Sequence, residues 1–182
     1  MYKTIYYNHI NIFMVYLKLS YFMLKINNNS NILILPDIRS AINVGSIFRT
    51  SDAVGIDKIY LVGCTPRPTD QFGRIQKDIS KSALGAETWI PWEYKEKILP
   101  LVKSLKKNGY EVVALDQDKN SIDYRVYKKA KKFAFILGPE VIGLDKNILK
   151  VCDKIVEIPM HGKKESLNVS VACGVALFQI LK

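Results

Sequence analysis

The sequence predicts an α/β domain whose mostly parallel sheet carries helices on both faces. Short aliphatic runs alternate along the chain with longer segments whose apolar residues follow the helical period. Residues 132–137 form an almost continuous apolar run, which is typical of a parallel strand buried on both faces. A chain of 182 residues that is 48% hydrophobic is also long enough to bury one such core.

The first elements predict a βαβ unit. An aliphatic strand at 31–36 is followed by a helical period over 43–54 and by a second strand at 58–63. Asn43 is a candidate cap for the start of the helix, and Gly55 is a candidate for its end. The two strands should therefore run parallel and be joined by a right-handed crossover.

The later elements continue this alternation. The long connection from Cys64 to Pro91 contains one short helix, and the Lys-rich segment from Glu93 to Asn108 predicts an amphipathic helix that Gly109 ends. Pro100 should kink or break that helix. Further strands are expected at 110–115, 132–137 and 154–159, and further helices at 77–84, 145–151 and 166–182.

Residues 1–29 contain three Lys and no Asp or Glu. Their apolar run, from Ile10 to Leu24, is too short to span a bilayer and is interrupted by Lys18. We therefore expect residues 1–29 to be an N-terminal extension or a false translation start rather than a membrane anchor. Residues 30–182 should form the domain itself.

The charge balance favours a polyanionic partner. Lys and Arg total 27 against 17 Asp and Glu, a formal net charge of +10, which suits RNA, DNA or an anionic membrane surface. The alternative is that the positive charge reflects a general enrichment of the sequence in Lys, which accounts for 22 of the 27 cations, and not a binding surface. Three widely spaced cysteines fit a reducing cytoplasm, and with two histidines they complete no zinc set, so no metal site is expected.

Ligands of such sheets bind beyond the carboxyl ends of the strands. Polar residues gather on or just after those ends: Asn43, Arg49, Glu140, Ser166 and Asn168. Each also has an ordinary structural role, as a helix cap, a first-turn carboxylate or a solvated ion pair. Dinucleotide, P-loop and nucleophile-elbow motifs are absent from the sequence. These residues alone indicate a basic α/β domain with a polar cluster at its strand ends.

Three sequence motifs are more specific than these single residues. They read Asn43-Val-Gly-Ser-Ile-Phe-Arg49-Thr-Ser-Asp-Ala-Val-Gly55, Phe135-Ile-Leu-Gly-Pro-Glu140-Val-Ile-Gly-Leu144 and Ile158-Pro-Met-His-Gly-Lys-Lys-Glu-Ser166-Leu-Asn168-Val-Ser-Val-Ala172. Taken together and in this order, they resemble the SpoU/TrmH family of RNA 2′-O-ribose methyltransferases, of the SPOUT class. The resemblance covers residues 31–182.

The resemblance implies S-adenosylmethionine as methyl donor and a deep trefoil knot at the carboxyl end of the domain. The family holds this cofactor largely through backbone groups of the knot loops. The corresponding positions here are Leu115, Gly138, Ile158, Met160 and Leu167.

The resemblance also implies methyl transfer to a ribose 2′-hydroxyl. The family assigns the main catalytic role to the arginine at the position of Arg49. Arg49 would act either as a neutral group in a desolvated pocket or as a cation that stabilises developing alkoxide charge, and the second alternative costs less free energy. Asn43 would hold Arg49 or the RNA backbone, and Glu140 would orient groups through hydrogen bonds. Ser166 and Asn168 would shape the donor site and position the ribose.

The implied partners are a tRNA or rRNA and a second copy of the chain, with no membrane. A homodimer would bury the closing helix through Val171, Val175 and Phe178. Candidate phosphate contacts are Lys128, Lys129, Lys131, Lys132, Lys163, Lys164, Arg67 and Arg74, although a solvated face is the simpler interpretation of residues 128–132. The alternatives are a non-catalytic RNA-binding protein on the same scaffold and a small-molecule methyltransferase.

Overall fold

A computed structural model describes residues 29–139 and 143–182. Almost all described residues belong to one compact unit, Asn31–Lys182. The expectations for residues 1–29 fall almost entirely outside the described residues. Across the described ranges, no helix combines the length and the apolar character that a membrane crossing requires.

Seven strands and six helices make up the described part of this unit. The strands are β1 (Ser30–Pro36), β2 (Lys58–Val62), β3 (Trp92–Lys95), β4 (Glu111–Leu115), β5 (Ile122–Asp123), β6 (Lys132–Leu137) and β7 (Lys154–Glu157). The helices are α2 (Ala41–Val54), α3 (Lys77–Ala83), α4 (Ala86–Trp89), α5 (Ile98–Lys107), α6 (Lys146–Val151) and α7 (Val169–Ile180).

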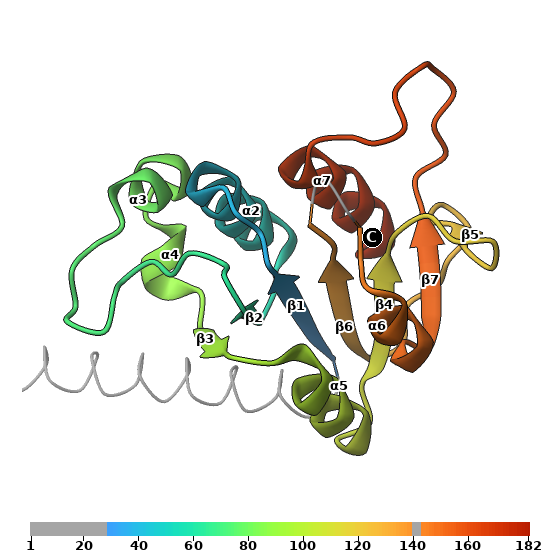
Figure 1. The fold of residues 1–182 in the computed structure, drawn as a ribbon, viewed down its shortest axis with the longest axis horizontal. Coiled ribbons are helices and arrows are strands. Elements are labelled where there is room, and N and C mark those ends of the chain that lie inside the picture. The colour runs from blue at the N-terminus through green and yellow to red at the C-terminus, as the bar shows by residue number, and fades with distance from the viewer. Residues whose placement is uncertain (1–28, 140–142) are drawn as a thin grey trace, which may run out of the picture. The chain divides into compact units, whose positions relative to one another are not determined.

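The strands form one sheet in the order β3-β2-β1-β6-β4-β7-β5. Pairs β1–β2, β2–β3, β4–β6, β4–β7 and β5–β7 are parallel. The arrows of β1, β6, β4 and β7 point the same way in Figure 1. The predicted mostly parallel sheet is therefore confirmed, whereas the knot stays a prediction.

Helices cover both faces of the sheet, as the sequence predicts. In β6, Phe133 and Phe135 face a core shared with α2, α3, α4 and α7. Ala134 and Ile136 alternate with them and face a second core shared with α5 and α6. Burying each large apolar side chain contributes roughly 1.5–3 kcal/mol. The continuous apolar runs in the sequence follow from this burial on two faces.

The start of α2 differs from the prediction. Ser40, not Asn43, caps the helix: its side chain accepts a hydrogen bond from the Asn43 backbone N–H at 3.3 Å. Gly55 ends the helix as predicted, with φ at +76°, a left-handed conformation that glycine adopts without strain. The Asn43 side chain is thereby left for a longer-range contact.

The predicted helix from Glu93 to Asn108 is wrong in its first part. Residues Trp92–Lys95 form the edge strand β3, where aromatic side chains suit a pleated surface. Helix α5 begins only at Ile98, so Pro100 lies in its first turn, where the missing N–H breaks no helical bond. The remaining predicted strands and short helices are confirmed within a residue or two. The sequence did not predict α4 or β5, which are too short to show a period.

The closing helix also begins later than predicted. Helix α7 starts at Val169, and Asn168 is its cap, with its side chain accepting from the Ser170 N–H at 3.0 Å. Ser166 therefore lies in the preceding loop rather than at a helix end. This loop connects β7 to α7 and borders the cavity described below.

Gly45 allows α2 and α3 to pack closely. A Cβ atom at this position would lie 2.0 Å from Ser82 Oγ and 2.5 Å from the Ile79 carbonyl oxygen. We expect Gly45→Ala to lower the free energy of unfolding by about 1–3 kcal/mol, because the two helices must move apart. Urea denaturation measures the change.

Gly174→Ala is the matched control, because a Cβ there would meet only Thr50 Cγ2, at 4.0 Å. Alanine in this helix interior should stabilise the protein by up to about 1 kcal/mol. Equal destabilisation by both substitutions would contradict the account of close packing at Gly45.

Candidate functional site

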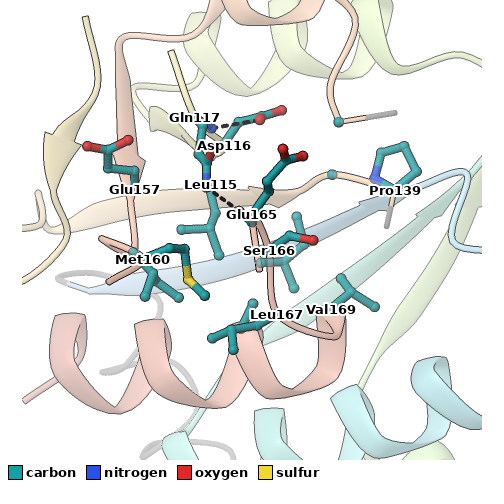
Figure 2. Close-up of a pocket in the computed structure, with 15 residues that line it drawn as sticks. Leu115, Asp116, Gln117, Pro139, Glu157, Met160, Glu165, Ser166, Leu167 and Val169 are labelled. Carbon is teal, nitrogen blue, oxygen red and sulfur yellow. Dashed lines mark hydrogen bonds between the residues drawn. The ribbon is translucent and has the colours of Figure 1, made fainter. Parts of the chain in front are cut away.

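A cavity of about 260 Å³ lies beyond the carboxyl ends of β4, β6 and β7 (Figure 2). Strand register explains its position. Leu115, at the end of β4, pairs with Leu137 of β6 on one side and with Val156 of β7 on the other. The three strands therefore end level, and their connecting loops surround one hollow. The lining residues are Leu115, Asp116, Gln117, Leu137, Gly138, Pro139, Gly143, Glu157, Ile158, Met160, Glu165, Ser166, Leu167, Val169 and Ala172.

Asp116 joins the loops that follow β4 and β6. Its Oδ1 accepts a hydrogen bond from the Gln117 N–H at 2.7 Å, and its Oδ2 accepts one from the Leu144 N–H at 2.5 Å. Its own backbone N–H donates to the Val156 carbonyl of β7 at 3.0 Å. One residue thus fixes all three strand ends relative to one another.

Two glycines permit this close approach. Gly143 has φ at +65°, and a Cβ there would lie 3.0 Å from Asp116 Oδ2. At Gly138, a Cβ would lie 3.0 Å from Leu144 Cγ and 3.3 Å from the Leu144 nitrogen. Larger side chains at either position would push Leu144 and Asp116 apart and deform the cavity wall.

Gln117 holds the loop between β7 and α7 against the end of β4. Its Nε2 donates to the Glu165 carbonyl oxygen at 2.6 Å, a contact drawn in Figure 2. Ser166 and Leu167, the next two residues, then line the cavity. A single side-chain bond therefore links residues 48 positions apart in the sequence.

The lining is acidic although the whole chain is basic. Asp116, Glu157 and Glu165 border the cavity, and its lining includes no Lys, Arg or His among the described residues. The formal net charge of the chain is +10. Carboxylates around a small cavity favour a cationic ligand, and they disfavour a phosphate-bearing one.

The five residues predicted to hold a cofactor all line this cavity: Leu115, Gly138, Ile158, Met160 and Leu167. They supply apolar surface together with backbone groups at strand ends, the mixture that binds a nucleoside-like molecule. Their role in binding a cofactor stays a prediction.

The predicted catalytic residues are brought together only in part. Ser166 lines the cavity. Asn168 Nδ2 donates to Asn43 Oδ1 at 3.2 Å, so the starts of α7 and α2 meet beside it. Glu140 lies outside the described residues.

Arg49 is exposed on α2 and does not line the cavity within one copy of the chain. It lies six residues beyond Asn43, or about 9 Å farther along the helix axis. Its predicted role therefore requires a second element that brings it to the reacting atoms.

The sequence analysis missed four polar residues of the lining: Asp116, Gln117, Glu157 and Glu165. The first two directly follow a correctly predicted strand, so the strand-end rule already pointed to them. Glu157 was hidden inside the predicted strand 154–159, because β7 ends at that residue.

The sequence profile of the SpoU rRNA Methylase family matches residues 30–178. The chain belongs to this family. The resemblance predicted from the three motifs is thus confirmed. Over 153 residues the chain is 30% identical to a Staphylococcus saprophyticus protein assigned to the TrmH family of tRNA/rRNA methyltransferases. The match covers 84% of this chain but 59% of that relative, so this chain spans little more than half of its length.

Solved structures of SpoU and TrmH proteins share the fold. An AdoMet-bound rRNA methyltransferase from Sinorhizobium meliloti matches with a TM-score of 0.75 at 28% identity, over 84% of this chain and 56% of that one. The A. aeolicus TrmH/SpoU tRNA modifying enzyme matches with a TM-score of 0.73 at 27% identity, over 84% and 74% of the two chains.

Gln117→Ala should loosen the wall of the cavity in this SpoU-family chain. Losing one such hydrogen bond costs about 1 kcal/mol, so amide hydrogen exchange in residues 163–167 should rise roughly fivefold. Gln179→Ala is the control, because its Nε2 donates to a different carbonyl, that of Arg125, at 3.4 Å. Unchanged exchange in the Gln117 variant would contradict the proposed support of the loop.

Proposed function

We propose that this chain transfers a methyl group from S-adenosylmethionine to a ribose 2′-hydroxyl of a structured RNA, either tRNA or rRNA. The observation that carries the proposal is an acidic cavity at three level strand ends, with no Lys, Arg or His among its described lining residues, in a chain of net charge +10. Membership of the SpoU rRNA Methylase family supports the same reaction.

The cavity residues fit S-adenosylmethionine. This molecule carries a sulfonium and an ammonium group and no phosphate, so Asp116, Glu157 and Glu165 complement its charge. Leu115, Ile158 and Leu167 offer apolar contact for its adenine, and neighbouring backbone groups offer hydrogen bonds. When bound, it supplies a methyl group on a cationic sulfur, which is a strong electrophile.

The basic surface beside the cavity suits RNA. Lys163 and Lys164 are exposed in the loop that contributes Glu165 and Ser166 to the lining. Lys132 is engaged within the chain, because its Nζ donates to the Asn108 carbonyl at 3.0 Å and lies 5.6 Å from the centre of the Tyr110 ring. The loop lysines are therefore better candidates for phosphate contact than Lys132.

The polar residues position the sugar and stabilise the charge that develops on it. The ribose 2′-oxygen would bond to the methyl carbon while the carbon–sulfur bond breaks and leaves a neutral thioether. The hydroxyl proton would pass to water, so negative charge grows on the oxygen as the proton leaves. The guanidinium of Arg49 stabilises that oxygen with its planar fork of N–H donors. Ser166 orients the ribose together with Asn43 and Asn168, which are hydrogen-bonded to each other. Glu140 orients groups of the site through hydrogen bonds.

A homodimer brings Arg49 to the reacting atoms. Helix α2 packs against α7 (Figure 1), and Thr50, the residue after Arg49, approaches Gly174 of that helix. The outer face of α7 carries Val171, Val175 and Phe178, which are 50%, 38% and 57% exposed. Pairing two copies through this face covers the apolar surface and places Arg49 of one copy near the cavity of the other.

The chain should bind S-adenosylmethionine in calorimetry and methylate bulk tRNA or rRNA at 2′-oxygens, read by mass spectrometry. Arg49→Lys should keep cofactor affinity and lose at least about a hundredfold in methylation rate, because a point charge cannot replace the guanidinium fork. Arg125→Lys is the control: Arg125 is exposed, pairs with Asp123 and does not line the cavity, so this variant should keep the full rate.

Full methylation by the Arg49 variant would contradict its role. RNA binding without any binding of S-adenosylmethionine would favour a non-catalytic RNA-binding protein on the same scaffold. Methylation of small molecules, with RNA affinity independent of salt, would favour a small-molecule methyltransferase.

Phe178→Glu should convert the dimer to a monomer in light scattering, because it buries a charge in the apolar face of α7. Methylation should fall with it while S-adenosylmethionine binding persists in the isolated copy. Val126→Glu, which alters an exposed apolar residue outside α7, is the control and should leave the dimer intact. An unaltered protein that is monomeric and fully active would overturn this part of the proposal.

A further inference from the structure

Another cavity, of about 450 Å³, lies beyond the carboxyl ends of β2 and β3, outside the site described above. Residues that follow β2 form one side of it, including Cys64, Arg67, Asp70 and Arg74, and Tyr94 of β3 forms the other. Unlike the acidic cavity, this one carries two arginines among its lining residues. The sequence analysis named Arg67 and Arg74 as candidate phosphate contacts, but the proposed reaction gives this cavity no role.

Asp70 holds the loop of this cavity in a defined shape. Its Oδ1 accepts from the backbone N–H groups of Phe72 at 2.8 Å and Arg74 at 3.0 Å, and its Oδ2 accepts from Arg74 Nε at 2.6 Å. Thr69 and Ile75 pair across the loop as an antiparallel bridge. The Arg74 amide and guanidinium hold the pKa of Asp70 below its ordinary value. These contacts therefore hold residues 69–75 in one defined conformation.

Two arginine–aromatic pairs lie at this cavity: Arg67, Tyr94 and Arg74 line it, and Phe72 belongs to the same loop. The Arg67 guanidinium lies 4.4 Å from the centre of the Tyr94 ring, and the Arg74 guanidinium lies 5.2 Å from the centre of the Phe72 ring. Arg67 is exposed and Phe72 is 71% exposed, so each pair leaves a flat surface open to solvent. Guanidinium planes and aromatic faces of this kind stack on unpaired nucleobases.

The two cavities share one edge of the sheet. Strand β1 lies between β2 and β6, so two strand spacings, roughly 10 Å, separate the β2 end from the β6 end. Arg39, exposed just after β1, lies between them, close enough for its charge to act on the Cys64 thiol. Three of the five arginines of this Lys-rich chain are thus gathered along this edge: Arg39, Arg67 and Arg74.

We propose that the cavity beyond β2 and β3 binds an unpaired nucleotide of the RNA substrate that lies near the methylated ribose. Its base stacks on the Arg67–Tyr94 pair and on Phe72, and Arg39 and Arg74 contact the adjoining phosphates. This inference rests on the proposed function, and it names single-stranded RNA as the substrate form.

Arg67→Gln should weaken binding of a short, mixed-sequence single-stranded RNA about tenfold in fluorescence anisotropy. The slope of log affinity against log salt should change little in this variant, because Arg67 stacks on the base, whereas Arg39→Gln should make the slope shallower by about 0.7, the contribution of one phosphate contact on a single strand. Lys103→Gln removes the same charge from an exposed position on α5 and is the control. Identical affinity in the Arg67 and Lys103 variants, or an unchanged slope in the Arg39 variant, would overturn the proposal.

Phe72→Ala should weaken the same RNA about tenfold without changing the salt slope, because stacking releases no counterions. Val126→Ala, which truncates another exposed apolar residue, is the control and should have no effect. Equal binding of single-stranded and fully duplex RNA by the unaltered protein would also overturn the proposal, because paired bases cannot stack in the cavity.

Cys64 provides a readout inside the cavity without any substitution. It is exposed, whereas burial raises the pKa of Cys152 to about 11 and also raises that of the buried Cys173. Loss of solvation raises the pKa of the Cys64 thiol as well, so labelling with a maleimide is best done at mildly alkaline pH. Single-stranded RNA should slow the labelling of Cys64 severalfold, and undiminished labelling at saturating RNA would contradict the proposal.

These outcomes are separable from failure of the proposed function. A chain that binds RNA through this cavity but neither binds S-adenosylmethionine nor methylates RNA would contradict the function alone. A chain that methylates RNA with unchanged affinity in the Arg67 and Phe72 variants would contradict the nucleotide site alone.

Discussion

The common direction of the strands is the constraint on which both cavities depend. Parallel strands deliver every connecting loop from a strand end to the same edge of the sheet. Register then makes β4, β6 and β7 end level, and Asp116 ties their loops together through its backbone N–H and both carboxylate oxygens. Without that shared edge, Gln117 could not hold the Glu165 carbonyl, and the residues of the third motif would not reach the cavity.

Charge is distributed unevenly along this edge. Carboxylates surround the cavity at β4, β6 and β7, whereas arginines follow β1 and β2. The proposed cationic methyl donor and the proposed polyanionic substrate would therefore meet complementary surfaces side by side. Electrostatic attraction acts on both at once, and neither surface favours the ligand of the other.

The sequence predicted most of the fold because burial on both faces of the sheet leaves long apolar runs, as in β1 and β6. It misassigned Glu93, because the edge strand β3 is amphipathic and its charged residues also suit a helix. It named Asn43 as a cap although the neighbouring Ser40 fills that place, and no local pattern shows the long-range bond to Asn168. The predicted cofactor positions came from motif resemblance. The strand-end rule pointed to Asp116 and Gln117, but only the three-dimensional register shows that their side chains join the loops of three strands.

The proposed chemistry is tested most directly by mapping ribose methylation by mass spectrometry in RNA from cells with and without this protein. The account predicts at least one nucleotide of a tRNA or rRNA that carries a 2′-O-methyl group only when the protein is present. Restoring the gene with the Arg49→Lys substitution should leave that nucleotide unmethylated. Identical methylation maps in cells with and without the protein would contradict the account.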